Sequence, residues 1–263
     1  MFYKYVGAAT QEETLTLFNR IVAEGSLKFA AALRVNDPFE FKFVPDPPPS
    51  YEQVLAWHAE HDPARSEEEL RRAWEAANGD AWDFIAGFEP RTRLLQNSYV
   101  LSLAGTATSP LMWSHYTRSY TGFVVQYDAA LIAALRELDL FEASGPVTYA
   151  DEAPRVRFFS DAPDDMVKAV YFTKARVWSY EGEYRVVANG APGHDAIYLN
   201  VSPSLIKGVI LGGRAGEALK RRALEVRESQ PGFEVSILSS EGSSYGLLTK
   251  ALDPRIASPT QMF

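Results

Sequence analysis

The residues most capable of chemistry lie in the segment 174–185, which reads K-x-x-x-W-x-Y-E-x-E-Y-R. If this segment runs as a strand, the alternation of side chains places Glu181, Glu183 and Arg185 on one face. Two carboxylates and a guanidinium are costly to bury unless they are paired. The pattern therefore indicates either an exposed, salt-bridged strand face or a site that holds a carboxylate firmly beside a cation.

A second segment, L-M-W-S-H-Y at 111–116, offers an indole, a hydroxyl, an imidazole and a phenol in consecutive positions. On a helix or a tight turn these groups point in several directions, so only some of them can share a pocket. Trp113 and Tyr116 also have the spacing of core residues on a helix, with His115 as a hydrogen-bonded packing residue. Both interpretations stay open for this segment.

The composition is that of a globular protein, with 46% hydrophobic residues in a chain of 263 and a formal net charge of −8. The absence of cysteine excludes disulfides, thiolate metal sites and a cysteine nucleophile. The acidic balance disfavours a protein that coats nucleic acid non-specifically. No apolar stretch approaches the roughly 18–20 residues of a membrane span, and no signal-peptide pattern is present, so we expect a cytoplasmic protein with no membrane partner.

The pattern of apolar residues predicts an α+β fold with a mixed, largely antiparallel sheet and flanking helices. The first strand is expected at 2–6. Thr10 and Glu13 form the capping-box pattern T-x-x-E, which opens a helix that runs to about Glu24 and that Gly25 ends. Further strands are predicted at 27–29, 98–103, 122–128, 147–149, 183–188, 205–211 and 233–238, and further helices at 129–138, 164–173 and 216–227.

Prolines between residues 45 and 50 form a stiff spacer, and helical patterns follow it as far as about Arg91. We therefore expect a single domain, 1–263, that carries a helical insertion at 46–96. Residues 51–90 have a net charge of −7, which leaves −1 for the rest of the chain. The acidic insertion is a candidate lid or partner surface, whereas the nearly neutral sheet domain allows a polyanionic ligand.

Four motifs together resemble a large bacterial family of proteins of unknown function. They are NDPFE at 36–40, Ser102-Leu103, LMWSHY with the later GF at 111–123, and the segment at 174–185. One departure is Val35, where the family usually has phenylalanine, and this changes only packing. The resemblance covers most of the chain outside the expected insertion, and it names no activity.

The order of these elements is more distantly similar to the ADP-ribosyltransferase superfamily. That similarity implies a split sheet that holds NAD between two pairs of strands, with no metal. It also implies that Glu183 on a late strand is the catalytic carboxylate, with Glu181 as the preceding member of E-x-E. Ser102 would be the second-strand hydroxyl, and Lys4 or Tyr5 the first-strand residue that orients NAD.

The remaining residues implied by the similarity surround the other parts of NAD. Trp113 and Tyr116 would supply aromatic contacts, while Lys174 and Arg185 would pair with the pyrophosphate. His115, counted with the catalytic residues, or Tyr116 would contact nicotinamide or the acceptor. A carboxylate near the ribose stabilises the oxocarbenium-like state in which the nicotinamide–ribose bond breaks, and it can also act as a base. The similarity thus implies an NAD-dependent transferase of the toxin or phage-defence type, acting on a protein or nucleic acid.

Two other functions remain open from the residues themselves. A metal-independent nuclease could use His115, Lys174 and Glu183, with the basic residues around Lys220 holding a strand. A non-enzymatic binding module could instead contain a mutually satisfied polar network. The transferase predicts that Glu183, Ser102 and the first strand surround one open cleft. The nuclease predicts positive potential from Lys220 to His115.

Overall fold

The computed structural model describes residues 1–35, 37, 39–45, 50–61, 64–77, 95–157, 163–240, 242 and 245–253. Strand β1 (Phe2–Val6) leads into helix α1 (Gln11–Phe18), and the predicted capping box between Thr10 and Glu13 is present. The helix continues as a π-helical turn, η1 (Asn19–Ala23). Gly25 then takes a left-handed backbone conformation with φ of +69°, which ends the helix and starts β2 (Ser26–Ala31).

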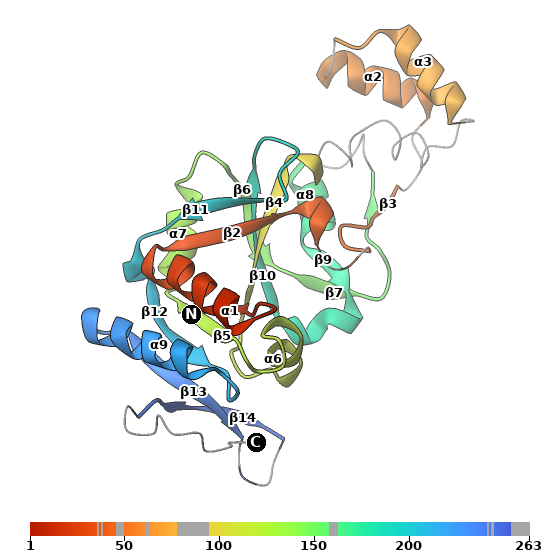
Figure 1. The fold of residues 1–263 in the computed structure, drawn as a ribbon. Coiled ribbons are helices and arrows are strands. Elements are labelled where there is room, and N and C mark those ends of the chain that lie inside the picture. Colours follow the sequence, from red (N-terminus) through yellow and green to blue (C-terminus); the bar gives the residue numbers. More distant parts are fainter. Residues whose placement is uncertain are drawn as a thin grey trace.

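The rest of the described chain alternates between strands and short helices (Figure 1). None of the described helices is long and apolar enough to cross a membrane. The elements that follow β2 are η2 (Ala32–Arg34), β3 (Val44–Pro45), α2 (Tyr51–His61), α3 (Glu67–Ala76), β4 (Ser98–Ala104), α6 (Pro110–Tyr116), β5 (Phe123–Tyr127), α7 (Ala130–Arg136), β6 (Phe141–Pro146), β7 (Thr148–Ala150), β8 (Arg155–Val156), α8 (Pro163–Tyr171), β9 (Thr173–Ala175), η3 (Arg176–Glu181), β10 (Glu183–Asn189), β11 (Ala196–Asn200), η4 (Pro203–Leu205), β12 (Ile206–Leu211), α9 (Glu217–Ser229), β13 (Glu234–Ser240) and β14 (Leu247–Ala251).

Ten of the strands form one sheet, in which eight strands follow the order β11-β2-β4-β1-β5-β12-β13-β14 and β10 and β6 branch from β4. The pairs within this sheet are antiparallel except for β12 with β13. The predicted α+β class with a mixed, largely antiparallel sheet and flanking helices is therefore confirmed. Strands β6, β11 and β14 were not predicted from the sequence.

Strand β4 is the point at which the sheet divides. Strand β10 pairs with β4 along its whole length, from Ala104 to Ser98. The other edge of β4 takes β2 at Tyr99 and Val100 but β1 only at Ala104. Strands β1 and β2 therefore diverge from each other along this edge of β4, and the sheet is split beside Ser102.

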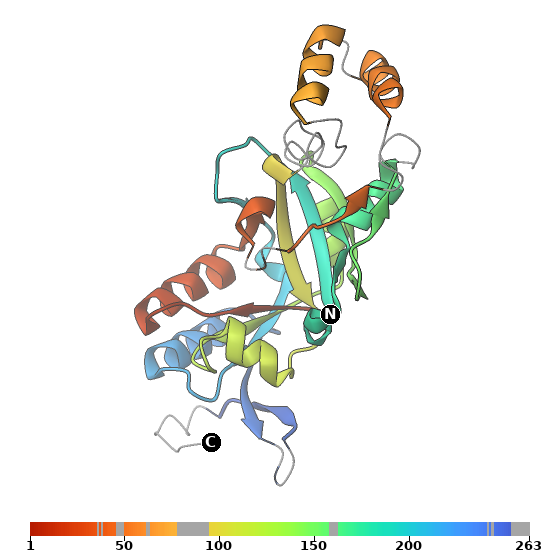
Figure 2. The ribbon, with the colours of Figure 1, turned by 90° about the vertical axis from the view of Figure 1, so that its right-hand side faces the viewer.

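The two faces of β4 and β10 differ in what covers them. Tyr99, Leu101 and Leu103 of β4 point into the largest core, which also contains Phe18 of α1 and Ala223 of α9. Figures 1 and 2 show α1 and α9 together on this side of the sheet. The intervening residues of β4 and β10 point to the opposite face, and that face carries the polar site described below.

Helices α2 and α3 form a hairpin with a small core of its own around Val54 and Leu70. In both views this hairpin stands away from the sheet (Figures 1 and 2). Ser66 begins α3 with the predicted capping box. Residues 46–49 and 78–94 lie outside the described residues, so the boundaries of the 46–96 insertion stay a prediction.

Two tyrosines in the largest core provide a matched stability test. Both are fully buried, but the Tyr99 hydroxyl donates to the Ala191 carbonyl, whereas the Tyr127 hydroxyl has no hydrogen-bond partner among the described residues. We expect Tyr99→Phe to lower the free energy of unfolding by about 1–2 kcal/mol and Tyr127→Phe to leave it unchanged or raise it by up to about 1 kcal/mol. Urea denaturation measures both, and equal losses would show that the Tyr127 hydroxyl is satisfied.

Candidate functional site

A pocket of about 320 Å³ lies where the sheet divides, and its lining comes from segments far apart in the sequence. Ser102 of β4 and Lys4 of β1 contribute from the split itself. Among the other lining residues are Lys28, Asp37, Glu40, Tyr116, Lys174, Trp178, Glu181, Glu183 and Arg185. A volume of this size is at the lower end of the range of about 300–1,000 Å³ for small-molecule sites.

Strand alternation explains how β10 supplies two of the charged groups. Glu183 and Arg185 are two residues apart and therefore point to the same face, and Arg185 is paired across the ladder with Ser102. The Arg185 guanidinium donates from Nε to Glu183 Oε1 at 2.8 Å and from Nη2 to Glu183 Oε2 at 3.1 Å. It also donates from Nη1 to the Tyr171 carbonyl at 2.6 Å. The guanidinium is thus held by two points on one carboxylate and anchored to a neighbouring segment.

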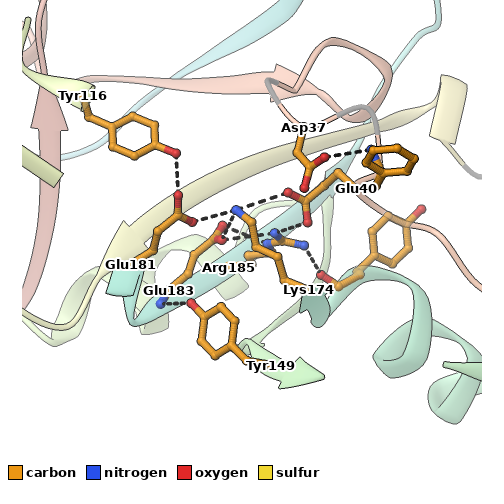
Figure 3. Close-up of polar contacts among 10 residues, drawn as sticks. Asp37, Glu40, Tyr116, Tyr149, Lys174, Glu181, Glu183 and Arg185 are labelled. Carbon is orange, nitrogen blue, oxygen red and sulfur yellow. Dashed lines mark hydrogen bonds and ion pairs between the residues drawn. The ribbon is translucent and has the colours of Figure 1, made fainter. Parts of the chain in front are cut away.

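Two further carboxylates and a lysine complete a buried ion network (Figure 3). Glu40 accepts from Arg185 Nη2 at 2.6 Å. Lys174 Nζ lies 2.6 Å from Glu181, 3.2 Å from Glu183 and 3.2 Å from Glu40. Three carboxylates therefore share two cations, which gives the network a formal charge of −1. Arg185 is 2% exposed and Glu183 is 5% exposed, so water screens these charges little.

Aromatic side chains border this network. The Tyr116 hydroxyl donates to Glu181 at 2.5 Å, and the Tyr149 hydroxyl accepts from the backbone N–H of Glu183 at 2.9 Å. Lys174 Nζ lies 5.3 Å from the centre of the Trp178 ring, within the range of a cation–π contact. The pocket thus combines an anionic floor with aromatic walls.

The predicted strand face at 181–185 is wrong at its first residue. Glu181 closes the 3₁₀ helix η3, and Gly182 follows with φ of +50° before β10 begins at Glu183. In a continuous strand, the alternation of side chains would have placed Glu181 and Glu183 on one face. The left-handed conformation of Gly182 interrupts the strand, so Glu181 lies outside it. The two carboxylates still meet, but they meet through Lys174.

The charges within the pocket shift several pKa values. Burial raises the pKa of Glu183, but attraction to Arg185 and Lys174 and a hydrogen bond from Ser102 outweigh it and lower the pKa to about 2. Burial lowers the pKa of Lys4 to about 8, although Glu183 opposes this shift. Burial and the bond to Glu181 raise the pKa of the Tyr116 phenol. Glu183 is therefore ionised, and Tyr116 is a neutral donor, at neutral pH.

The low pKa of Glu183 predicts how acid affects stability. A carboxyl group whose pKa falls from 4.5 to about 2 on folding contributes stability that is fully present above pH 4.5. That contribution is lost as the pH falls toward 2. We expect the free energy of unfolding, measured in urea between pH 2 and 5, to vary less steeply in Glu183→Gln than in the wild type. The surface variant Glu68→Gln should keep the wild-type slope, and identical slopes in all three proteins would contradict the assignment.

The structure brings most of the sequence-predicted residues to this pocket. Lys4 Nζ donates to the Ser102 carbonyl at 2.8 Å. Tyr5 lines the pocket as well, but its hydroxyl is bound to the Thr106 carbonyl. The same pocket is lined by Tyr116, Lys174, Glu181, Glu183 and Arg185.

Two predicted residues lie elsewhere. Trp113 is completely buried in the core beneath α6, and its indole N–H donates to the Ala107 carbonyl. His115 is exposed on the outer side of α6 and does not line the pocket, and its ring lies 6.3 Å from that of Tyr180. The helix forms because Ser109 caps it and Pro110 occupies its first turn, and its helical spacing separates His115 from Tyr116.

Sequence reasoning missed several residues of the site, among them Trp178, Glu40, Lys28 and Tyr149. Glu40 is the last residue of the NDPFE motif, but nothing in the motif shows that it pairs with Arg185, which is 145 positions away. Lys28 carried no signal beyond its charge. Tyr149 lies on the predicted strand at 147–149, which the structure shifts by one residue to β7 (Thr148–Ala150).

Comparison with known protein families finds a match to the central part of the chain. Residues 112–186 match the model of DUF2971, a family of proteins of unknown function. The matched range includes Tyr116, Lys174 and the Glu181–Arg185 segment, whereas Lys4 and Glu40 lie outside it. No curated protein and no solved structure matches the chain.

The carboxylates of the pocket are arranged around side-chain cations. No group of three or more histidine, cysteine, aspartate or glutamate side chains with metal-binding geometry occurs among the described residues. Lys174 and Arg185 occupy the positions between the carboxylates where a cation would bind.

Proposed function

We propose that this pocket binds NAD and that the protein cleaves the nicotinamide–ribose bond, passing ADP-ribose to an acceptor. The observation that carries the proposal is the meeting of Glu183, Ser102 and Lys4 in one open pocket at the split of the sheet. These three residues come from a late strand, a central strand and the first strand. The split between strands, and not the α+β class as such, is what brings these three side chains into one pocket.

The electrostatics suit this reaction. When the C–N bond breaks, nicotinamide leaves with the electron pair and the ribose develops positive charge, which a nearby carboxylate stabilises. Glu183 is ionised at neutral pH because its pKa is about 2. A group of such low pKa is a poor proton acceptor, so Glu183 acts by its charge and the proton of the attacking acceptor group passes to solvent water.

The aromatic side of the pocket suits the nicotinamide ring. Tyr116 and Trp178 line it, and Glu181 lies beside Tyr116. A cationic ring is attracted to aromatic faces and to a carboxylate. The volume of about 320 Å³ is sufficient for the nicotinamide-ribose part of the dinucleotide.

A binding module without catalysis is the second candidate, and one observation favours it. Glu183 is 5% exposed and both of its oxygens are bound to cations. A buried, satisfied network can serve to fix structure alone. The nuclease has less support, since Lys220 and Arg222 of α9 pair with Glu217 and Glu225 of the same helix.

Incubation with NAD separates these candidates. The wild-type protein is expected to release nicotinamide, measured by liquid chromatography, and to transfer label from the adenylate part of NAD to a component of a cell lysate. Binding of NAD without nicotinamide release would support the binding module. Absence of NAD binding at millimolar concentration would exclude both the transferase and an NAD-binding module. If the component that receives the label is essential to the cell, its modification would support a toxin or defence role for the protein.

A further inference from the structure

The split leaves part of one edge of β4 without a strand. Ser102 pairs with Arg185 of β10 on one side, but on the other side β2 stops at Val100 and β1 begins at Ala104. The Ser102 carbonyl faces this gap, because it accepts a hydrogen bond there from Lys4 Nζ. In an antiparallel strand the N–H and C=O of one residue point the same way, so the Ser102 N–H faces the gap too.

Two lysines stand on either side of this gap. Lys4 comes from β1 and Lys28 from β2, and both line the pocket. They are close enough for the charge of Lys28 to lower the pKa of Lys4. Within the part of the chain that the structure describes, neither lysine forms a salt bridge with a carboxylate. Two like charges beside an uncovered backbone N–H are repulsive unless an anion lies between them.

The carboxylates nearest to Lys4 are already bound to other cations. Glu183 is paired with Arg185 and Lys174, and Glu181 is paired with Lys174. Arg34, another cation of the lining, is bound to Asp195. Lys4 and Lys28 therefore form no ion pair with the network on the pocket floor, although Glu183 attracts Lys4 through space.

We propose that this gap is a binding site for a phosphate or pyrophosphate group, held by Lys4, Lys28 and the backbone N–H of Ser102. Phosphate oxygens are strong acceptors for ammonium groups and for backbone N–H groups. The assignment of that group to the diphosphate of NAD rests on the proposed function. It places the diphosphate on the β2 side of the split, with the aromatic and acidic side left for nicotinamide.

Isothermal titration calorimetry with inorganic pyrophosphate and with ADP tests the site on the full-length protein. We expect wild-type binding of both compounds, weakened roughly tenfold or more in Lys28→Met and in Lys4→Met. Lys168→Met is the matched control, because Lys168 is exposed on α8 and paired with Asp165. An amide shift of Ser102 on addition of pyrophosphate, followed by NMR, reports the backbone contact even if one variant folds poorly.

The outcomes separate the site from the reaction. Binding of pyrophosphate that both lysine variants weaken, with no cleavage of NAD, would support the anion site and reject the proposed function. Cleavage of NAD with an unchanged KM in Lys28→Met would overturn the anion site and leave the proposed function standing. Equal weakening in Lys168→Met, or no heat and no Ser102 shift in the wild type, would also overturn the site. Tighter binding of ADP than of pyrophosphate would identify the ligand as a nucleotide.

Discussion

Replacement of Arg185 by methionine is expected to lower the free energy of unfolding by about 3–5 kcal/mol. The guanidinium is 2% exposed and is bound to Glu183, Glu40 and the Tyr171 carbonyl. Methionine fills similar space but leaves three buried carboxylates, Glu40, Glu181 and Glu183, to share Lys174 alone. Breaking a buried network by removing one partner costs far more than the network contributed, because the remaining charge is unpaired in a medium of low polarity.

Arg176→Met is the matched control for that experiment. Arg176 pairs with Asp151 at 2.8 Å, but the two side chains are 60% and 73% exposed. An exposed pair of this kind contributes about 0–1 kcal/mol, so the variant should unfold nearly as the wild type does. If Arg185→Met is too unstable to measure, Glu183→Met/Arg185→Met should recover part of the loss, because it removes the charge left unpaired. Equal effects of the two single arginine variants in urea denaturation would show that the network is not desolvated.

Much of the fold could be predicted because its elements carry local signals. The capping box at Thr10 and the left-handed Gly25 mark both ends of the first helical segment within the sequence itself. The strands at 98–104 and 123–127 are mostly apolar and are buried on both faces, as central strands of a covered sheet are. Strands β6, β11 and β14 were missed because they are only partly buried, so their apolar periodicity is weak.

The contacts within the site also differ in how far the sequence predicts them. Some follow from a local pattern, and others depend on which strands become neighbours. Glu183 and Arg185 meet through strand alternation, which the sequence shows directly. Their pairing with Glu40, and the gap beside Ser102, depend on which strands neighbour β4, and no local pattern contains that information. His115 shows the opposite error: its chemical capability was evident, but the helix turns it outward.

Replacement of Glu183 by glutamine is expected to reduce nicotinamide release from NAD by about 10²–10³-fold. Glutamine keeps the size of the side chain and one acceptor oxygen but removes the charge that would face the developing oxocarbenium ion. The effect should appear in kcat more than in KM, because that positive charge develops only in the transition state. The rate should also be nearly constant between pH 5 and 7 in the wild type, since the pKa of Glu183 is about 2.

Glu68→Gln makes the same chemical change on the exposed face of α3, where the side chain is 64% exposed and paired with Arg72. This control should retain the wild-type rate. Because Glu183→Gln also removes a partner of Arg185, the thermal unfolding midpoint and NAD affinity must be measured on the same preparation. A folded Glu183→Gln protein that binds NAD as the wild type does but releases nicotinamide hundreds of times more slowly would support a catalytic carboxylate. A folded variant with the wild-type rate would leave Glu183 as a structural partner of Arg185, and the carboxylate that acts on the ribose would then have to be sought in Glu181 or Glu40.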